Sequence, residues 1–356
     1  MVVYMAPCYR NPSEMPSTSL GTTSHDRIVT GHHQMVTARR PAPATPAGQE
    51  TPLAHIQEDA IREEPLADAT TSAGDNATLQ ARRVAAAAWR KRWYIVRYLI
   101  IQCLGLVVPW FVGISGWSLA LAAVTYCIGM FGVTGGYHRY FAHRSYKTSR
   151  PFAVALAVMA QMTAQKGIIW WARGHRHHHR FSDAERDLHS PLQRGFVYSH
   201  VGWLFDTDDH PSDDPVADLE QVPELVWLDR HWLVPPVLWG LLYCLVGGWE
   251  ALFTGYFFAV VLLHHGTFTI NSLSHVWGSR TYDTRDTSRN NFVLALITFG
   301  EGWHNNHHHY MRSTRQGFQW WQLDITYLVL KGLEKVGLVW DLHEPPKRVL
   351  TKNLLR

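Results

Sequence analysis

The stretch WLVPPVLWGLLYCLVGGWEALFTGYFFAVVLLHHGTFTI, residues 232–270, decides the fold. It contains no Lys, Arg or Asp, and its one acidic residue, Glu250, lies in the short segment GGWEA. This segment separates two apolar runs, residues 232–248 and 251–270, and a run of about 20 apolar residues is long enough to cross a bilayer. The stretch therefore predicts a transmembrane helical hairpin with its turn at GGWEA.

A second pair of apolar runs, residues 98–114 and 117–137, is separated only by GISGW. Tryptophans, which favour the membrane interface, lie near the ends of the runs at Trp93, Trp117, Trp232 and Trp249. The predicted fold class is an all-α integral membrane protein with four transmembrane helices in two hairpins. The alternative is a soluble all-α protein with four buried helices, but long uncharged runs with charge on one side only disfavour it.

The basic residues predict how the hairpins are oriented. Neither GISGW nor GGWEA contains Lys or Arg, whereas residues 138–230 contain eleven and residues 82–97 contain six more. Because cytoplasmic loops carry the excess of Lys and Arg, both termini and the central segment are expected in the cytoplasm. The net charge of +4, concentrated beside apolar runs, favours a membrane surface and no nucleic acid as partner.

The remaining segments set the domain boundaries. Residues 1–80 are rich in Pro, Thr, Ser and Ala, which predicts a disordered tail. A membrane domain is expected over residues 81–346, followed by a short C-terminal tail, residues 347–356. A fifth apolar stretch, residues 151–171, is interrupted by polar residues and is expected as one helix at the cytoplasmic interface or against the site. The four cysteines form no CxxC pair, so neither a disulfide framework nor a zinc ribbon is predicted.

Seventeen of the 22 histidines lie between His138 and His309. They form HRYFAH at residues 138–143, HRHHH at 175–179 and HNNHHH at 304–309, with His275 between the last two. Positions i, i+3 and i+4 share one side of a helix, so each HxxHH is expected to present three imidazoles towards one point. HxxxxH turns about 140° around a regular helix, which suits a frayed helix end or two metals sharing their ligands.

Nine imidazoles are too many for one ion and suit two. Nitrogen ligation without thiolate is typical of iron, zinc, copper or nickel sites, and structural zinc is disfavoured because it takes four ligands, often including Cys. The predicted ligands are His138, His143, His175, His178, His179, His275, His304, His307 and His308.

Other polar residues near these motifs are weaker candidates for a role at the metal site. His177 and His309 fall outside the repeated spacing, and Asp187 and His189 are candidates for orienting ligands through hydrogen bonds. His264 and His265 lie inside the fourth apolar run, where an ionisable residue is a functional candidate.

The motifs HRYFAH, HRHHHRFSD, NSLSHVWGSRTYDTRDTSRNN and GEGWHNNHH, in this order with hairpins between them, resemble the membrane-bound fatty acyl desaturases of the stearoyl-CoA delta-9 type. The resemblance covers about residues 90–346, and GEGWHNNHH, WWQLDIT and VGLVWDLHEPP resemble the bacterial and plant branch. It implies that the nine histidines bind two iron ions and that Asn271 reaches one of them through water.

The resemblance also implies the reaction. Two electrons and O2 convert a long-chain saturated acyl substrate, acyl-CoA at the delta-9 position, into a cis monoene. The C–H bonds of a saturated acyl chain have no acidic proton, so a metal–oxygen oxidant is needed to break them. No HPGG motif of a fused haem domain occurs, so a separate electron donor is expected: a ferredoxin, a b-type cytochrome or a flavoprotein reductase. A bacterial cell membrane is favoured over the endoplasmic reticulum.

Some residues depart from the animal pattern and leave the acyl carrier open. Gly174 stands where animal members have an acidic residue, and residues 205–208 stand where they have basic ones. An acyl-lipid substrate is therefore an alternative, and four cations are candidate phosphate contacts: Lys147, Arg150, Lys166 and Arg173. Two other functions remain: a diiron membrane hydroxylase or monooxygenase, and a metal transporter, although a transporter would place ligands near the bilayer midplane.

Overall fold

The computed structural model describes residues 73–206 and 215–355. Helix α1 (Ala73–Leu106) contains residues 73–80 of the predicted N-terminal tail, and the rest of that tail lies outside the described residues. The last helix, α16 (Lys347–Thr351), occupies half of the predicted C-terminal tail. The described part is mostly helical, with one two-stranded antiparallel sheet formed by β1 (Lys147–Thr148) and β2 (Val339–Trp340).

Within the described residues, three helices are long and apolar enough to cross a membrane: Lys91–Val112, Gly116–Ala142 and Val234–Val276. The first joins the end of α1 to α2 (Pro109–Val112), and the second joins α3 (Gly116–Phe131) to the π-helix η1 (Gly132–Ala142). The third is 43 residues long and comprises α10 (Val234–Glu250), η3 (Ala251–Phe257), α11 (Phe258–Asn271) and α12 (Leu273–Val276). The four predicted apolar runs fall within these three helices or overlap them.

The longest of these helices is broken inside α10. Gly247 and Gly248 leave the helical region, and Gly248 has a φ of +63°. The rings of Tyr243 and Tyr256 lie 6.1 Å apart, although thirteen residues of unbroken helix would separate them by about 20 Å. The chain therefore doubles back at the predicted GGWEA turn.

The turns at the ends of the two helical pairs contact each other. Ser115 caps α3, and its backbone N–H donates to Glu250 over 2.8 Å. The hydroxyl of Thr254 donates to the carbonyl of Gly113, also over 2.8 Å. A Cβ at Gly105 would lie 2.7 Å from the carbonyl oxygen of Phe257, so a glycine lets α1 approach η3 closely. Both turns thus lie at one end of a four-armed bundle.

Two shorter helices cover η1 near the opposite end. Helix α4 (Arg150–Gln161) packs so closely that a Cβ at Gly132 would lie 2.6 Å from the carbonyl oxygen of Met159. Helix α5 (Ile168–Phe181) follows after a turn in which Ala164 and Lys166 have left-handed φ angles of 58° and 71°. The expectation of one helix over residues 151–171 is therefore wrong, because this turn divides the stretch into two helices.

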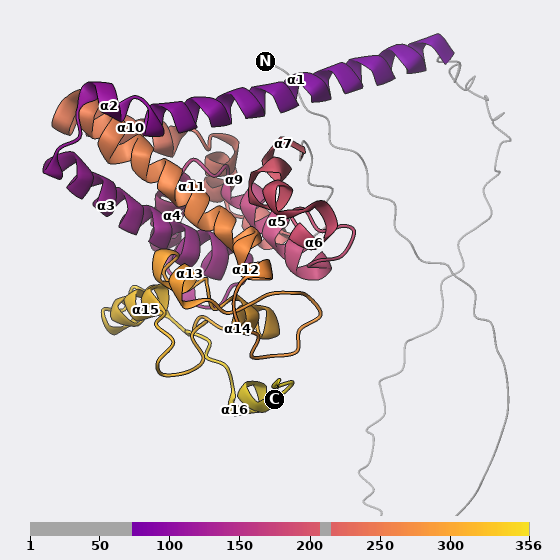
Figure 1. The fold of residues 1–356 in the computed structure, drawn as a ribbon, viewed down its shortest axis with the longest axis vertical. Helices are drawn as coiled ribbons and strands as arrows, with labels where there is room; N and C mark the ends of the chain where they lie inside the picture. Colours follow the sequence, from indigo (N-terminus) through magenta and orange to yellow (C-terminus); the bar gives the residue numbers. More distant parts are fainter. Residues whose placement is uncertain (1–72, 207–214, 356) are drawn as a thin grey trace, which may run out of the picture. The chain divides into compact units, whose positions relative to one another are not determined.

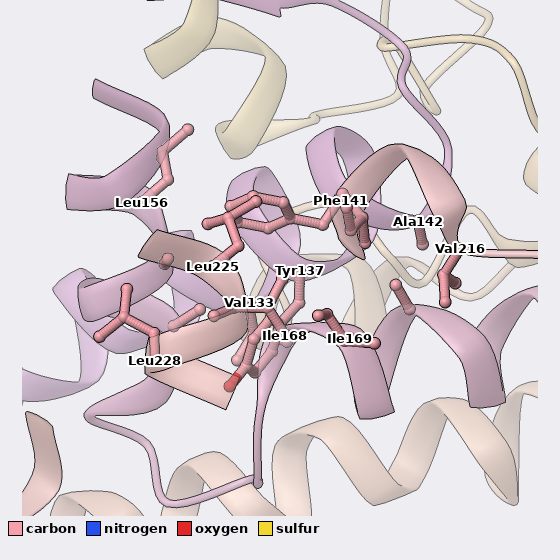
Figure 2. Packing of buried hydrophobic residues seen from close by; sticks show 14 of the residues in the cluster. Val133, Tyr137, Phe141, Ala142, Leu156, Ile168, Ile169, Val216, Leu225 and Leu228 are labelled. Atoms are coloured by element: carbon pink, nitrogen blue, oxygen red, sulfur yellow. The ribbon is translucent and has the colours of Figure 1, made fainter. Parts of the chain in front are cut away.

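A buried apolar cluster joins η1, α4 and α5 to α9 (Pro223–Arg230), as Figure 2 shows around Tyr137, Leu156, Ile168 and Leu228. At the start of α5 the carboxylate of Asp229 accepts hydrogen bonds from two backbone N–H groups, those of Ile169 at 2.8 Å and Trp170 at 3.1 Å. This cap satisfies amides that no helical carbonyl can reach, and it holds the histidine-bearing helix against the bundle.

The remaining elements are short and surround the same end of the bundle. Between α5 and α9 lie α6 (Pro191–Arg194), η2 (Tyr198–Gly202), α7 (Trp203–Asp206) and α8 (Ala217–Glu220). After α12 come α13 (Phe292–Ile297), α14 (His304–His309) and α15 (Ile325–Lys335). In Figure 1, the orange and yellow elements α12 to α16 lie below the long helices. This layer closes over the ends of η1 and α11, where the histidine motifs meet.

Candidate metal centre

Five of the predicted ligands form one group: His138, His143, His175, His179 and His307. Four contacts between their Nε2 atoms link all five rings. Those from His307 to His138 and His179 measure 3.0 and 2.9 Å, and those from His175 to His143 and His179 measure 2.8 and 3.0 Å. Two nitrogens bound to one ion at about 2.1 Å and at right angles would lie about 3.0 Å apart. The five nitrogens therefore surround a point that fits a metal ion.

Hydrogen bonding among the imidazoles does not account for this arrangement. Each Nε2 carries either one proton or one lone pair, yet the Nε2 atoms of His175, His179 and His307 each contact two others. Burial, followed by the neighbouring imidazoles, holds the pKa of His143, His175, His179 and His307 well below the ordinary value. These rings are therefore neutral, which is the form that binds metals.

The other four predicted ligands form a second group: His178, His275, His304 and His308. Their candidate ligand atoms all lie within 4.8 Å of one another, and the Nε2 atoms of His275 and His304 are 3.2 Å apart. Among the described residues the buried Nε2 of His308 has no hydrogen-bond partner, as expected of a nitrogen that faces an ion. All nine predicted histidines thus come together, divided five and four.

The expectation that each HxxHH motif faces one point is wrong. In α5, His175 and His179 join the five-histidine group, whereas His178 joins the four-histidine group. In α14, His304 and His308 join the four-histidine group, whereas His307 joins the other. Positions i and i+4 lie about 40° apart around a helix, but i+3 lies about 60° to the other side. Each motif therefore bridges the two groups.

The HxxxxH motif also differs from expectation. His138 belongs to the π-helix η1 and His143 caps its end, and the backbone N–H of His143 donates to the carbonyl of His138 over 3.1 Å. This i to i+5 bond is the pattern of a π-helix, in which residues five apart lie on one side. Both imidazoles consequently reach the same group, without a frayed end and without being shared between two sites.

Aspartates support three imidazoles of the four-histidine group. Their oxygens lie close to Nδ1 of the ligands: Asp187 at 2.9 Å from His178, Asp183 at 3.1 Å from His275 and Asp286 at 2.6 Å from His308. A carboxylate at Nδ1 keeps the proton there, orients the ring and leaves the Nε2 lone pair for a metal. Asp187 was predicted for this role, whereas Asp183 and Asp286 were not.

The charge of these aspartates is maintained by their partners. Burial opposes ionisation of Asp187 and Asp286, but the histidine beside each one holds the pKa of the carboxyl well below its ordinary value. Hydrogen bonds from Thr287 and Ser190 to Asp183 act in the same direction. The four-histidine group is therefore backed by three carboxylates.

The five-histidine group has a different support. Glu301 lies 2.6 Å from Nδ1 of His138, and the fully buried Arg139 bridges Glu301 at 3.0 Å and Asp324 at 2.9 Å. A buried Arg requires such partners, and here they tie η1 to the segments on both sides of α14. Sequence reasoning missed these residues, although Glu301 in GEGWHNNHH, Asp183 in HRHHHRFSD and Arg139 in HRYFAH lie inside the motifs themselves.

The weaker sequence candidates lie outside the two groups. The ring of His189 is 4.4 Å from that of His178, in a small cluster that includes Asp187. His177 and His309 contact backbone carbonyls through Nε2, at 3.0 and 2.9 Å. In α11, His264 lies 2.8 Å from the carbonyl oxygen of Thr163, and His265 lies 3.0 Å from His200.

Two pockets adjoin the histidine groups. The larger has a volume of about 930 Å³, including space open to solvent, and is bordered by α1, α5, α7 and α11, including Tyr94, Trp170, Trp203 and Phe268. The smaller has a volume of about 490 Å³, measured in the same way, and runs beside Met130, Val133 and Ile270. The pockets share four lining residues: Trp171, His175, Thr267 and Asn271. Asn271 therefore lies where the two apolar pockets meet beside His175.

Of the four candidate phosphate contacts, three form ion pairs with the protein's own carboxylates. Lys147 pairs with Asp341, Arg150 with Glu224 and Arg173 with Glu220, at 2.8, 2.6 and 2.6 Å. Lys166 instead lines the larger pocket, where its ammonium group lies 4.2 Å from the ring centroid of Tyr94 and 4.1 Å from that of Trp170. Residues 205–208 stand where animal desaturases have basic residues. Of these, Asp206 forms ion pairs with Lys91 and Arg194, and Thr207 and Asp208 lie outside the described residues.

An apolar helical bundle with two polyhistidine groups at one end and an apolar pocket beside them defines a membrane protein whose site is compatible with metal binding and with a lipid-like molecule. A family model for fatty acid desaturases matches residues 115–341. The chain belongs to the fatty acid desaturase family, is a membrane protein, and its activity is oxygen-dependent desaturation of fatty acyl chains.

The names of individual relatives differ in the acyl carrier. The chain is 36% identical to the sn-2 palmitoyl-lipid 9-desaturase of Nostoc sp. (strain 36), over 73% of this chain and 93% of the relative. It is 39% identical to the Delta-9 acyl-lipid desaturase 1 of Arabidopsis thaliana, over 73% and 87%. It is 34% identical to the Hex-5-enoyl-[acyl-carrier protein] acetylenase of Moorena producens (strain JHB), over 74% and 89%.

Proposed function

We propose that the nine histidines hold two iron ions and that the enzyme removes two hydrogens from adjacent methylenes at the delta-9 position of a long saturated acyl chain. The product is a cis monoene. One O2, two electrons, two protons and the two hydrogens removed from the chain together form two waters. The observation that carries this proposal is the junction of both apolar pockets at Trp171, His175, Thr267 and Asn271.

Iron fits this donor set and this reaction. Imidazole nitrogen suits several transition metals, but zinc has no redox chemistry and an unactivated C–H bond must be oxidised. Iron, when bound, supplies with O2 the oxidant that no side chain can provide. Burial keeps four of the imidazoles neutral, those of His143, His175, His179 and His307. The protein orients four others through Asp183, Asp187, Asp286 and Glu301, and it limits the access of water with apolar walls. Asn271 is placed to hold a water against one ion.

The pockets suggest how the acyl chain is held. We assign its carboxyl half to the larger pocket and its methyl half to the smaller one, which is lined by Met130, Val133 and Ile270. The chain would then pass the histidines at Trp171, whose ring stacks on His175 at 5.0 Å and on Tyr137 at 5.2 Å. These contacts keep the indole fixed, so that one carbon–carbon bond is presented to the metal site.

For the acyl carrier, the ion pairs favour a membrane lipid over the acyl-CoA that the overall resemblance suggests. The CoA head group carries several phosphates, yet Lys147, Arg150 and Arg173 are each paired with a carboxylate. Lys166 and Arg97 are the two cations that line the larger pocket. They suit a small polar head group at the membrane interface, where long cationic side chains reach the water.

We further propose that the four arms of the bundle cross the membrane as two hairpins. The 43-residue helix is about 64 Å long at helical rise, roughly twice the thickness of the hydrocarbon core, and it is folded at Gly247 and Gly248. The basic residues of the central segment favour a cytoplasmic position for the histidine groups and both termini. Electrons would arrive there from a separate donor, and a bacterial cell membrane is the favoured location.

The test is the fatty acid profile of a desaturase-deficient host that expresses the chain with a compatible reductase. The wild type should produce a new delta-9 monoene, His178→Ala should not, and the control His309→Gln, outside both histidine groups, should retain it. A bond at another position would overturn the regiochemistry. An hydroxylated product would favour the hydroxylase alternative, and iron binding without any oxidised product would contradict the proposal.

The carrier is tested separately with purified enzyme, iron and reductase in lipid nanodiscs. Stearoyl-phospholipid supplied within the nanodisc should be desaturated, and added stearoyl-CoA should be turned over much more slowly. The reverse order would assign acyl-CoA as the substrate and would leave the desaturase reaction itself intact.

A further inference from the structure

Helix α13 presents an unusual apolar face. Its sequence is FVLALI, and no charged residue occurs between Phe292 and Gly300. Leu294 and Ala295 are buried, whereas Phe292 is 54% exposed, Val293 51%, Leu296 47% and Ile297 38%. Large contiguous apolar patches are rare on surfaces that face water and mark contacts with proteins or membranes.

Two tryptophans extend this face. Trp320 is 90% exposed and Trp321 55%, so their indole rings have little protein around them. The buried ring of Trp303 contacts both parts from inside, 5.7 Å from the ring of Trp321 and 6.4 Å from that of Phe292. We call the six exposed residues the α13 patch: Phe292, Val293, Leu296, Ile297, Trp320 and Trp321.

The second membrane helix shows how deep the patch lies. The hydroxyl of Tyr126 donates to the carbonyl oxygen of Ile297 over 2.7 Å, and its ring lies 6.2 Å from that of Phe299. Tyr126 lies ten residues after the start of Gly116–Ala142, or about 15 Å along the helix axis. The hydrocarbon core is about 30 Å thick, so the C-terminal end of α13 reaches well into the depth range of the membrane helix.

The backbone of α13 is prepared for an environment without water. The Asn291 side chain caps the helix by accepting from the N–H of Leu294 over 3.1 Å. At the other end, the carbonyls of Leu294, Ala295, Ile297 and Phe299 all accept hydrogen bonds. In hydrocarbon each unpaired backbone group costs several kcal/mol, so these hydrogen bonds lower the cost of placing the ends of a short helix in lipid.

From the depth and exposure of α13, we propose that the α13 patch is a re-entrant contact with the lipid bilayer. The helix dips into hydrocarbon beside the second membrane helix without crossing the membrane, and Trp320 and Trp321 lie at the interface, where tryptophan is favoured. The occupant is lipid because the patch is continuous with a helix whose own outer face meets lipid. This proposal is independent of the metal and of the substrate.

The contact would anchor the third histidine motif to the membrane. The backbone N–H of Asn291, at the start of α13, donates to the carbonyl of Gly302 over 2.8 Å. The side chain of Asn290 donates to Asn306 over 2.8 Å, and Asn306 lies between His304 and His307 in α14. A lipid-anchored α13 therefore holds α14 at a defined height above the bilayer.

The test is site-specific fluorescence quenching in phosphatidylcholine nanodiscs. Leu296→Cys is introduced into a full-length chain whose four cysteines are replaced by serine, and it is labelled with a bimane. Leu245→Cys, at a residue 86% exposed on α10, is the lipid-facing control, and Glu185→Cys, in an exposed loop, is the aqueous control. A nitroxide placed midway along the lipid chain should quench position 296 as strongly as position 245, and aqueous iodide should quench only position 185.

Two outcomes would overturn the proposal. Quenching of position 296 by iodide would place the patch in water, and protection from both quenchers would place it against protein, such as a second copy of this chain. If the cysteine-free chain does not fold, the wild type is labelled with a photoactivatable phosphatidylcholine and mapped by mass spectrometry. Label on residues 292–297 then supports the contact, and label confined to the three membrane helices contradicts it.

Discussion

The carboxylate of Asp286 accepts a 2.6 Å hydrogen bond from Nδ1 of His308, the shortest of three aspartate–histidine contacts around the four-histidine group. Within the described residues, the five-histidine group has Glu301 as its one carboxylate in this role, and Arg139 compensates its charge. The two groups therefore differ in the negative charge behind their ligands as well as in ligand number. Mutations that remove this charge should affect one ion and spare the other.

Asp286→Asn should lower the affinity of the four-histidine group for iron by about 10- to 100-fold, because the amide can still accept a hydrogen bond but no longer stabilises a positive centre. The purified variant should retain close to one iron per chain where the wild type retains two, as measured by plasma mass spectrometry. Asp283→Asn, at a largely exposed carboxylate nearby, is the control. An unchanged stoichiometry and affinity would contradict the supporting role of Asp286.

Met130→Trp should change the preferred chain length. Met130 is buried and lines the smaller pocket, so a bulkier side chain would shorten the space assigned to the methyl end of the substrate. We expect the ratio of sixteen- to eighteen-carbon monoenes to rise by about tenfold, which corresponds to about 1.4 kcal/mol of discrimination. Val124→Trp, on the exposed side of the same helix, should leave the ratio unchanged. Equal product ratios in the two variants would mean that the methyl end of the substrate does not occupy this pocket.

Gly302→Ala should prevent the stable assembly of the third histidine motif. A Cβ at Gly302 would lie 2.0 Å from the backbone nitrogen of Ala295 and 2.5 Å from the carbonyl oxygen of Asn291, and backbone atoms cannot move aside cheaply. We expect a loss of folded protein in detergent, measured by size-exclusion chromatography, and a loss of bound iron. Gly332→Ala, in α15 with nothing near its Cβ, should instead be neutral or raise the free energy of unfolding by about 0.5–1 kcal/mol.

Asp218 should make stability depend on pH. Its carboxylate binds both terminal nitrogens of Arg176, at 2.9 and 3.0 Å, and Arg176 also donates to carbonyls at the end of η1. Partial burial opposes ionisation, but hydrogen bonds from Arg176 hold the pKa of Asp218 below its ordinary value of 3.8. A lowered pKa means that this stabilisation is present above about pH 4 and is lost as the pH falls below it.

Asp218→Asn should therefore melt about 2–4 °C lower than the wild type at pH 7, a modest amount because solvent screens the pair. The difference should persist down to about pH 4 and shrink below it, as measured on metal-free protein by thermal denaturation in detergent. Asp341→Asn, at an exposed ion pair with Lys147, should show almost no difference at any pH. If the difference in melting temperature stayed constant down to acid pH, the effect of Asp218→Asn would not be electrostatic.

Much of the architecture could be predicted from local patterns. The apolar runs that end at GISGW and GGWEA predicted two turns, and the structure brings these turns together through Ser115 and Glu250. All nine histidines chosen from motif spacing lie in the two groups. Local patterns sufficed because apolar length and the choice of imidazole as a ligand are properties of short segments.

Other features depended on how segments pack. The break between α4 and α5 requires left-handed residues at Ala164 and Lys166, and no glycine or proline signals it at those positions. The π-helix that aligns His138 with His143 forms where η1 packs against α4 and α5. The partners of Arg139 come from positions more than 150 residues away in the chain.

The sequence by itself determined the membrane class, the two turns and the nine histidines that gather in the two groups. Only the tertiary structure decided which imidazole joins which group, which carboxylate contacts each ring, and where the two pockets meet. The reason is geometric, because a ligand is assigned by the rotation of one helix against its neighbours. The rotations of α5 and α14 set the five-and-four division, and they are fixed by contacts with η1, α12 and Asn290 rather than by HxxHH.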